Sequence, residues 1–474
     1  MRSFSDIFTA LQSRDTKKRM IAAWSVDEHT VSAASRAIDL GLVDVTLVGD
    51  EAMIAQVCSK ENIDISKFTV VHNPVELKAV AQAVQMVRDY LDNPHSAGSK
   101  IRIMPDMHLG KGIVIGFTGL MGTHVNPAHI GLDIGCGIDT QLFDRKLDEK
   151  DYAVFEHRIR KEIPVGQDIN GKSQFEMKAL LKFMRQEVNR AFQSARGMIN
   201  MVEFLTEDDL VAWMRSVNIQ PAVFYKSIGT LGGGNHFIEL QKDDEGFLWI
   251  MLHSGSRNLG KQVGDYYNKI AKELNAMYHT AVDPSWQMHF LPLGSKEFTA
   301  YWKEMSYCVD FALCNRQLMM DRIQEIIADA IPNVEFEPMI NIAHNYAAWE
   351  HHYGEDVIVH RKGAVRARAG EIGIIPGSQG TSSYIVEGLG CPESFMSSSH
   401  GAGRLMSRTE AIKTLSLQKE IEMLDSKGII HGIRSQNHLD EAASAYKNID
   451  EVMANQQDLV KILTRLSPIA VVKG

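Results

Sequence analysis

Glycine is concentrated in five short segments of this chain, and this concentration constrains the fold more than any other feature. The segments are residues 104–137, 229–239, 253–260, 363–390 and 400–404, and they hold 23 of the 36 glycines within 86 residues. Glycine is used where the backbone takes a positive φ or approaches a ligand closely. The same segments contain metal-binding and nucleophilic side chains, namely Asp106, His108, Asp133, Cys136, Asn235, His236, His253 and His400. Tight turns would explain any one segment, but all five together predict a ligand site built from loops.

The composition is that of a globular protein and excludes several classes. Of the 474 residues, 45% are hydrophobic and 23% charged, which excludes a disordered or collagen-like chain. Charges interrupt every apolar stretch before membrane-spanning length, and no secretory signal is recognisable, so we expect no membrane association. The five cysteines form no CxxC pair, which favours reduced thiols and a cytoplasmic location. The net charge of −9 argues against unspecific nucleic-acid coating but allows a local basic site.

The first part of the chain alternates between short apolar strands and helical segments. We predict strands at 19–24, 45–49 and 68–72 and helices at 27–41, with Asp27 as the N-cap, at 51–63 and at 75–91. This alternation favours a small parallel α/β domain. The Pro/Gly/Ser-containing segment 93–99 indicates its end, so we expect an N-terminal domain over residues 1–95 and a larger domain over 96–474.

The larger domain mixes strands and helices without the regular alternation of the first, which predicts an α+β fold. We expect strands within 101–140, 233–240, 247–253 and 356–390, helices within 174–217, 261–279, 298–330 and 439–467, and a terminal strand. Thr206 and Asp209 form a capping signature for one helix. The Met and aromatic residues of 298–330 predict core packing rather than cofactor contact.

Four motifs offer side chains that bind transition metals. Asp133 and Cys136 lie three residues apart in HIGLDIGCG, while GGGNHFIEL, LHSGSRNLG and INIAHNY supply His236, His253 and His344. A mixed Asp/Cys/His set suits Mn²⁺, Fe²⁺, Co²⁺ or Zn²⁺, and a thiolate bridges two ions well. Each histidine alone would more often be structural. Together they favour a two-metal site for phosphoryl transfer, whereas the missing Cx₂C and HExxH patterns disfavour a zinc finger or a zincin.

Two further segments suggest contacts with a ligand. HRKGAVRARAG supplies Arg361, Lys362, Arg366 and Arg368, and the last two would share one face of a strand. That face would contact phosphate groups of a ligand, unless the segment is an ordinary solvated surface. His400 lies among small residues in SSSHGAGR, which leaves room for a bulky ligand beside the imidazole.

Taken together, the motifs resemble those of the RtcB family of RNA ligases, from about residue 100 to the end of the chain. The resemblance rests on MPDMHLGKG, HIGLDIGCG, LGGGNHFIEL, LHSGSRNLG, HRKGAVRARAGEIGIIPGSQG, SSSHGAGRLMSR and the terminal VVKG, in this order. It implies an enzyme that joins RNA 2′,3′-cyclic phosphate or 3′-phosphate ends to 5′-hydroxyl ends in RNA repair or tRNA splicing. It further implies GTP, two Mn²⁺ ions, a histidine–GMP intermediate and a GMP-activated RNA 3′ end.

The resemblance also implies a role for each matching residue. Cys136 corresponds to the thiolate that bridges both manganese ions, with His253 and His344 on one ion and Asp133 and His236 on the other. His400 corresponds to the guanylylated histidine, and Asp106 to the carboxylate that orients it. The remaining correspondences concern the nucleotide and are Asn235, Glu239, Ser378, Ser383, Arg404, Tyr446 and Lys473.

Partners and alternatives follow from the same comparison. The expected substrate is RNA with broken ends, such as tRNA halves or cleaved ribosomal RNA, and the resemblance allows an activating protein partner. A metal-dependent cyclic phosphodiesterase would need the metal set but not His400. An RNA-end-binding protein would need neither metal nor nucleophile. Residues 1–95 resemble the opening of phosphate acetyl- and butyryltransferases but are too short for such an enzyme, which favours a packing or dimerisation module over a docking module.

Overall fold

A computed structural model describes residues 18–23, 28–40, 43–72, 84–85, 87, 99–146, 149–172, 206–280, 282 and 287–473. The chain divides into two compact units, Met1–Asp89 and Tyr90–Gly474. The boundary expected between residues 95 and 96 lies outside the described residues, so its position stays a prediction.

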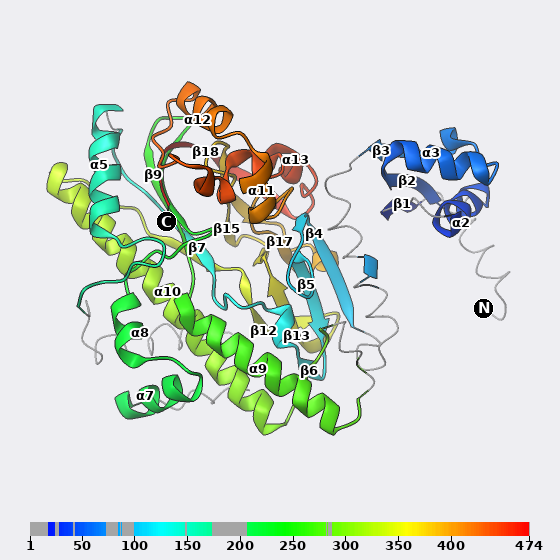
Figure 1. The fold of residues 1–474 in the computed structure, drawn as a ribbon, viewed down its shortest axis with the longest axis horizontal. Coiled ribbons are helices and arrows are strands. Elements are labelled where there is room, and N and C mark those ends of the chain that lie inside the picture. Colours follow the sequence, from blue (N-terminus) through cyan, green and yellow to red (C-terminus); the bar gives the residue numbers. More distant parts are fainter. Residues whose placement is uncertain are drawn as a thin grey trace. The chain divides into compact units, whose positions relative to one another are not determined.

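The N-terminal unit is a three-stranded parallel sheet with helices between its strands (Figure 1). Its elements are β1 (Lys18–Ala23), α2 (Glu28–Asp39), β2 (Val43–Gly49), α3 (Glu51–Lys60), η1 (Ile65–Lys67) and β3 (Thr69–His72). Val31, Leu47 and Ile54 are fully buried between the helices and the sheet. This unit is the small α/β domain that the alternation predicts. Asp27 and most of the helix expected at 75–91 lie outside the described residues.

The larger unit is built on two antiparallel sheets, which confirms the α+β class. The seven-stranded sheet has the order β11 (Ile340–Ala343), β7 (Gly137–Leu142), β9 (Leu248–Ser254), β8 (Phe237–Asp243), β18 (Val460–Lys473), β16 (Ser383–Gly388) and β15 (Ile372–Ile375). The four-stranded sheet has the order β12 (Asn345–His352), β13 (Glu355–Lys362), β5 (Ile115–Met121) and β4 (Lys100–His108). Two short pairs complete the strands: β6 (His124–Val125) with β10 (Leu291–Pro292), and β14 (Ala364–Arg366) with β17 (Ser397–Ser399).

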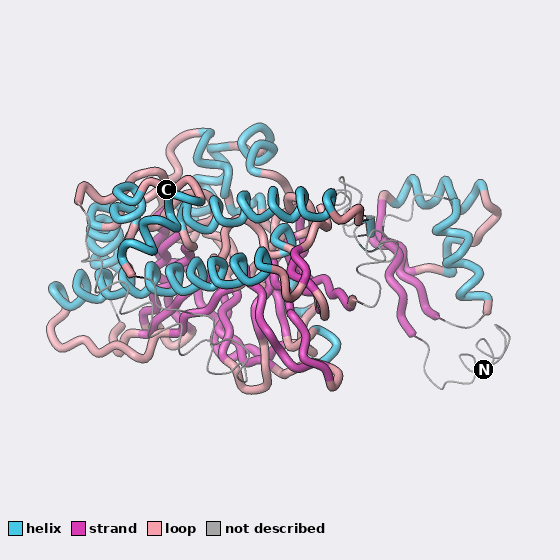
Figure 2. The backbone as a smooth tube through the Cα atoms, turned by 90° about the horizontal axis from the view of Figure 1, so that it is seen from below, coloured by secondary structure: helices cyan, strands magenta, loops and turns pink. Residues whose placement is uncertain are grey.

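Two long helices, α9 (Arg257–Met277) and α10 (Lys296–Ala330), lie side by side, and α10 packs against β7, β9 and β11 (Figure 2). Tyr301, Phe311 and Met320 of α10 are fully buried, so the Met and aromatic stripe is core as predicted. The capping box of Thr206 and Asp209 is also present. The remaining helices are η2 (Pro127–His129), α5 (Glu149–Glu162), α7 (Glu207–Ser216), α8 (Pro221–Ser227), η4 (Pro392–Ser394), α11 (Arg408–Thr414), α12 (Leu417–Ser426), η5 (Gln436–Glu441), η6 (Ala443–Ala445) and α13 (Ile449–Ala454).

The expected helix over 439–467 is wrong. Only short helical turns and α13 occupy its first half, and β18 begins at Val460. This strand lies between β8 and β16, and Pro468 falls where its register with β8 shifts, the kind of position where a sheet tolerates proline. Pairing on both sides therefore outweighs the local helical pattern. Among the helices that the structure describes, none is long and apolar enough to span a membrane.

Strand register places the glycine-rich motifs at one end of the large sheet. Gly137, at the start of β7, pairs with Ser254 at the end of β9 and with Ala343 at the end of β11. Phe237, at the start of β8, pairs with His253. Residues adjacent to these four strand ends therefore converge although they are far apart in the sequence.

Candidate metal and nucleotide site

The five residues expected to bind metal lie together at this end of the sheet and form two groups. Cys136, His253 and His344 make one group, and Asp133, Cys136 and His236 make the other; within each, the potential ligand atoms lie within 4.8 Å of one another. Cys136 Sγ is 3.2 Å from His253 Nε2 and 3.6 Å from His236 Nε2. His236 Nε2 is 3.0 Å from Asp133 Oδ2. The sulfur of Cys136 thus belongs to both groups.

Glycines let the loop that carries Cys136 pack tightly. Gly135 has φ +78°, and a Cβ there would lie 2.7 Å from Val309 Cα of α10. A Cβ at Gly137 would lie 2.0 Å from the Ile342 carbonyl oxygen, and one at Gly255 would lie 2.2 Å from Asp133 Oδ1. Side chains at these positions would displace the ligand-bearing segments, which explains the clustering of glycine seen in the sequence.

The donor set fits one or two transition-metal ions. His236 Nδ1 lies 2.9 Å from the Leu231 carbonyl, so Nδ1 donates and Nε2 is left to bind metal beside Asp133 and Cys136. His344 Nδ1 is buried without a hydrogen-bond partner in the described part of the chain, as a metal ligand would be. Burial, and then the charge of Asp133, raise the pKa of the Cys136 thiol, so a thiolate there needs a neighbouring cation. Sulfur, imidazole and carboxylate donors together suit Mn²⁺, Fe²⁺, Co²⁺ or Zn²⁺.

His400 and Asp106 form a hydrogen-bonded pair next to these ligands. Asp106 Oδ2 accepts from His400 Nδ1 at 2.5 Å and from the backbone N–H groups of His400 and Gly401 at 3.0 and 3.2 Å. Burial would raise the pKa of Asp106, but the charge and hydrogen bonds of His400 hold it below its usual value. The Asp106 carboxylate therefore fixes the proton on Nδ1 and leaves the ring lone pair on Nε2. The His400 ring centroid is 4.9 Å from that of His344.

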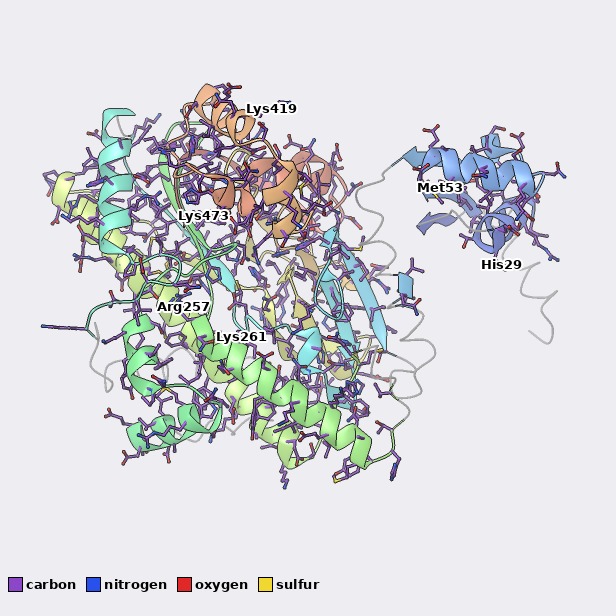
Figure 3. All side chains as sticks on the ribbon, in the orientation of Figure 1. His29, Met53, Arg257, Lys261, Lys419 and Lys473 are labelled. Carbon is purple, nitrogen blue, oxygen red and sulfur yellow. The ribbon has the colours of Figure 1, made fainter. Side chains whose placement is uncertain are left out.

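Glu239 and Ser383, both expected at the nucleotide, are linked by one side chain. Gln241 Nε2 donates to Glu239 Oε2 at 2.6 Å and to Ser383 Oγ at 3.1 Å. Burial raises the pKa of Glu239 to about 7. Lys473, at the end of β18 (Figure 3), pairs in register with Phe237 and interacts electrostatically with Glu239.

A second buried carboxylate, Glu441, organises the residues around Arg404. Its Oε2 accepts from Arg404 Nη1 at 2.6 Å and from the Tyr446 hydroxyl, and its Oε1 accepts from Arg408 Nε at 2.5 Å. The arginines, together with Lys473, lower the pKa of Glu441 to about 2 against the effect of its burial.

Ser378 and Asn235 lie on loops at the borders of this region. The backbone N–H of Ser378 donates to Thr381 Oγ1 at 2.7 Å. Asn235 Oδ1 accepts from Arg408 Nη2 at 3.5 Å, which connects the loop before β8 to the Glu441 cluster.

Comparison with known proteins assigns the family. Residues 93–474 match the family model described as tRNA-splicing ligase RtcB. The chain belongs to the RtcB family. It is 37% identical over 411 residues to the RNA-splicing ligase RtcB of Escherichia coli (strain K12), covering 85% of this chain and 95% of that protein. It is 32% identical over 423 residues to the tRNA-splicing ligase RtcB of Nanoarchaeum equitans, covering 78% and 87%. The RNA-splicing ligase RtcB of Mycobacterium bovis is 29% identical over 418 residues, covering 78% and 96%.

Several polar residues of this RtcB site were not predicted from the sequence. Arg408 falls within SSSHGAGRLMSR, so the motif itself was the signal that could have identified it. Gln241 follows Glu239 by two residues on β8, where alternation places both side chains on one face. Glu441 lies outside every glycine-rich motif, and only its three partners reveal its position.

The structure corrects the interpretation of the basic segment. Arg361 is fully buried and donates to both carboxylate oxygens of Glu350, at 2.5 and 3.1 Å. Lys362 is buried and donates to the carbonyls of Lys111 and Ala128 at 2.8 and 3.2 Å. These two cations therefore hold the RtcB fold together and do not face RNA.

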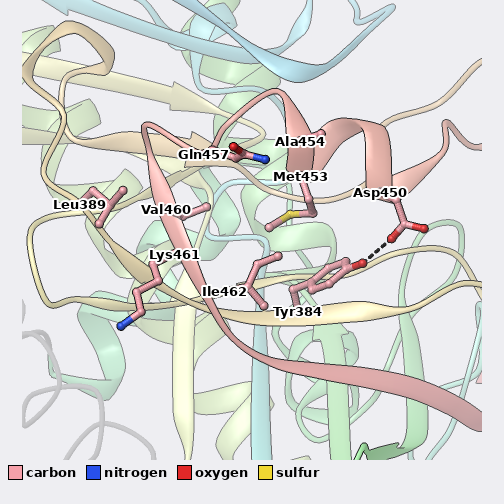
Figure 4. Close-up of a pocket in the computed structure, with 9 residues that line it drawn as sticks. All are labelled: Tyr384, Leu389, Asp450, Met453, Ala454, Gln457, Val460, Lys461 and Ile462. Carbon is pink, nitrogen blue, oxygen red and sulfur yellow. Dashed lines mark hydrogen bonds between the residues drawn. The ribbon is translucent and has the colours of Figure 1, made fainter.

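A cavity of about 580 Å³ is lined by residues of β16, α13 and β18 and of the loops beside them, and none of these is a predicted site residue (Figure 4). Its lining is Tyr384, Leu389, Asp450, Met453, Ala454, Gln457, Val460, Lys461 and Ile462. The Tyr384 hydroxyl donates to Asp450. Because side chains alternate along β16, Tyr384 faces this cavity while its neighbour Ser383 faces Gln241.

Proposed function

We propose that this protein is an RNA ligase that joins RNA ends bearing a 2′,3′-cyclic phosphate or a 3′-phosphate to 5′-hydroxyl ends. GTP is the proposed energy source, and two Mn²⁺ ions are the proposed metals. Membership of the RtcB family and the printed names of its relatives support ligation of RNA. The substrate proposed is RNA with broken ends, including tRNA halves or cleaved ribosomal RNA.

The observation that carries the proposal is the position of His400 beside the candidate metal ligands. A nucleophilic imidazole oriented by Asp106 lies with its ring centroid 4.9 Å from that of His344. A cyclic phosphodiesterase needs the metal donors but has no use for this oriented histidine. An RNA-end-binding protein needs neither, so the combination favours a ligase with a covalent histidine intermediate.

The proposed chemistry assigns a task to each group. His400 Nε2 attacks the α-phosphorus of GTP and releases pyrophosphate. Asp106 accepts a hydrogen bond from His400 Nδ1, which holds the proton on that nitrogen, and it stabilises the positive charge that develops on the ring. After any cyclic phosphate has been opened, the RNA 3′-phosphate takes GMP from His400, and the 5′-hydroxyl then displaces GMP to form the phosphodiester. Bound metal would polarise the phosphate oxygens. Asn235, Glu239, Ser378, Ser383, Arg404, Tyr446 and Lys473 are the proposed nucleotide contacts.

Incubation with α-³²P-labelled GTP and Mn²⁺ tests the proposal directly. The parent protein is expected to form an acid-labile protein–GMP adduct, and His400→Ala is expected to form none while still binding metal. Asp106→Ala should form the adduct slowly, because the imidazole loses the partner that fixes its tautomer.

RNA whose 3′ end carries GMP in advance provides the control for His400→Ala. The variant should still join this RNA to a 5′-hydroxyl end, since only the first step needs the nucleophile. An adduct that persists in His400→Ala would show that another residue is the nucleophile.

A further inference from the structure

Arg316, on α10, is fully buried behind the candidate metal ligands. Its Nη1 donates to the carbonyls of Gly135 and Ser254 at 3.0 and 2.8 Å. Its Nε donates to Asn341 Oδ1 at 2.8 Å, and its Nη2 to the Ile342 carbonyl at 3.4 Å. A single guanidinium thus bonds to three segments that are far apart in the sequence.

Each acceptor lies within three residues of a candidate ligand along the chain. Gly135 precedes Cys136 and Ser254 follows His253, while Asn341 and Ile342 are the third and second residues before His344. These three segments supply the whole of the group formed by Cys136, His253 and His344. The sulfur of Cys136 also belongs to the second group, so both groups depend on this arrangement.

We propose that Arg316 is a positioning residue that holds Cys136, His253 and His344 in the geometry required to bind metal. The inference rests on the proposed function in one respect, namely that the cluster binds metal. Arg316 forms no hydrogen bond with the ligand side chains and acts through residues that neighbour them in the sequence.

The shape of the guanidinium explains why arginine occupies this position. Its donors form a rigid planar fork, and here they reach acceptors on β9, on β11 and in the turn that precedes β7 at the same time. A lysine ammonium carries the same charge on one atom and cannot span these acceptors. Gly137 makes room for the fork, since a Cβ there would lie 2.9 Å from Arg316 Nη2.

Burial of a full cation is costly unless its partners compensate for it. Asp139 on β7 is also fully buried and interacts electrostatically with Arg316, but its burial raises the pKa of its carboxyl group well above the usual range. Both of its carboxylate oxygens lack hydrogen-bond partners within the described residues. The donors of Arg316 are therefore directed to the ligand-bearing segments and not to a carboxylate, which is what a positioning role requires.

Cobalt titration of the full-length protein tests the inference without an activity assay. Co²⁺ bound to a thiolate gives a charge-transfer absorption band, so binding and Cys136 ligation are measured together. Arg316→Lys keeps the charge and is expected to bind Co²⁺ about 10–100-fold more weakly, with a smaller band, as for other changes outside the ligand shell. Arg322→Lys is the matched control, because Arg322 lies on the same helix in surface ion pairs with Glu162 and Glu325.

Circular dichroism and thermal unfolding of the metal-free proteins separate positioning from folding. A purely structural role would lower the melting temperature of Arg316→Lys but leave the affinity and band of the folded protein unchanged, and this result would overturn the inference. If Arg316→Lys does not fold, Asn341→Ala removes one acceptor and should weaken Co²⁺ binding severalfold; unchanged binding would equally overturn it. If the parent binds no Co²⁺, the proposed metal function fails and the inference fails with it.

Discussion

Cys136 is the residue on which both candidate metal positions depend, because its sulfur belongs to each ligand group. At the scale of single residues, the site relies on a few groups of this kind that serve several partners at once. Asp106 accepts three hydrogen bonds at one oxygen, and Glu441 binds two arginines and a tyrosine. Substitution of such a residue should therefore disturb more than one interaction.

We predict that Cys136→Ser abolishes metal binding and adduct formation. The hydroxyl of serine stays protonated at neutral pH and cannot replace a bridging thiolate, so one change weakens both ions. Even changes outside the ligand shell cost about 10–100-fold in metal affinity, so the adduct yield should fall by at least ~100-fold. Metal analysis and labelled GTP measure both effects. Cys391→Ser, at a partly exposed thiol outside the site, should behave as the parent.

We predict that Glu350→Gln destabilises the protein by about 3–5 kcal/mol, because it leaves Arg361 as an uncompensated buried cation. Burial alone would raise the pKa of Glu350, but Arg361 and His352 lower it from 4.5 to about 2. A lowered pKa means that the contribution of the carboxylate is complete above pH 4.5 and is lost as the pH falls towards 2.

Urea unfolding at pH 7 and near pH 3 checks this prediction. The difference in unfolding free energy between the parent and Glu350→Gln should shrink at the lower pH. Glu355→Gln, at an exposed position on the same hairpin, should match the parent at both values. An equal loss in the two variants would contradict the assigned role of the buried pair.

The role of a single residue could be predicted from the sequence only where the residue lies in a recognisable motif. Asp133, Cys136, His236, His253 and His344 could be grouped because glycine-rich motifs surround most of them, and the fold brings them together. Arg316 gave no such signal, because a lone arginine within an amphipathic helix looks like a surface residue. Its burial follows from the docking of α10 on the sheet, which local sequence does not encode.

At the scale of elements, the two arginines that we expected on one face of a strand, Arg366 and Arg368, lie in different structures. Strand β14 ends at Arg366, and Arg368 lies in the turn that follows. Arg366 ends β14 and forms an ion pair with Glu371, with Nη2 and Oε1 2.5 Å apart. The side chain of Arg368, beyond the strand, forms no hydrogen bond or ion pair with the residues that the structure describes, and it is partly exposed. Arg368 is therefore the better candidate for an RNA phosphate contact.

We predict that Arg368→Ala reduces the salt dependence of RNA binding more than Arg366→Ala does. One lost phosphate contact on a single strand changes the slope of log K against log salt by ~0.7. Arg366 should contribute less, since Glu371 already neutralises it. Filter binding of a 3′-phosphate RNA from low to moderate salt measures the slopes. Identical slopes for Arg368→Ala and the parent would identify the segment as an ordinary solvated surface.

Helices and strands could be predicted where the local order of apolar and polar residues defines them. They were missed where the structure depends on pairing with residues far away in the sequence. Helices α9 and α10 follow from their amphipathic sequences, and the strands of the N-terminal unit follow from apolar runs between helices. By contrast, the first part of β18, residues 460–467, was expected to be helical, and only its last residues were expected to form a strand. Ile462 and Leu463 are adjacent and both half-exposed on this strand, so the sequence there lacks the alternation of apolar and polar residues that marks a half-buried strand. This part of β18 is therefore recognisable as a strand only from its pairing in the sheet.

At the scale of the whole molecule, the family match begins at residue 93, and the N-terminal unit lies before it. Every residue proposed to take part in the chemistry lies beyond residue 100. We propose that the N-terminal unit serves packing, dimerisation or docking and has no part in catalysis.

We predict that a truncated chain starting near Lys100 still forms the His400–GMP adduct at a rate within about twofold of that of the parent. Such a difference corresponds to a change in activation free energy smaller than RT, which is ~0.6 kcal/mol. Its affinity for RNA is expected to be equal or lower, depending on whether the unit docks substrate. Labelled GTP and size-exclusion chromatography of the two proteins provide the measurement. A folded, soluble truncation that cannot form the adduct would show that the unit or the boundary has been wrongly assigned.

The register of β7, β8, β9 and β11 has a consequence for how the protein acquires metal. Cys136 is 100 residues from His236 and 117 from His253, so an unfolded chain presents these donors far apart. Because only the folded chain brings them together, metal would bind the native state and stabilise it, by about 2.7 kcal/mol at a hundredfold excess over the dissociation constant. The supply of metal to a cell would then govern not only the rate of the enzyme but also how long each copy survives heat and proteolysis.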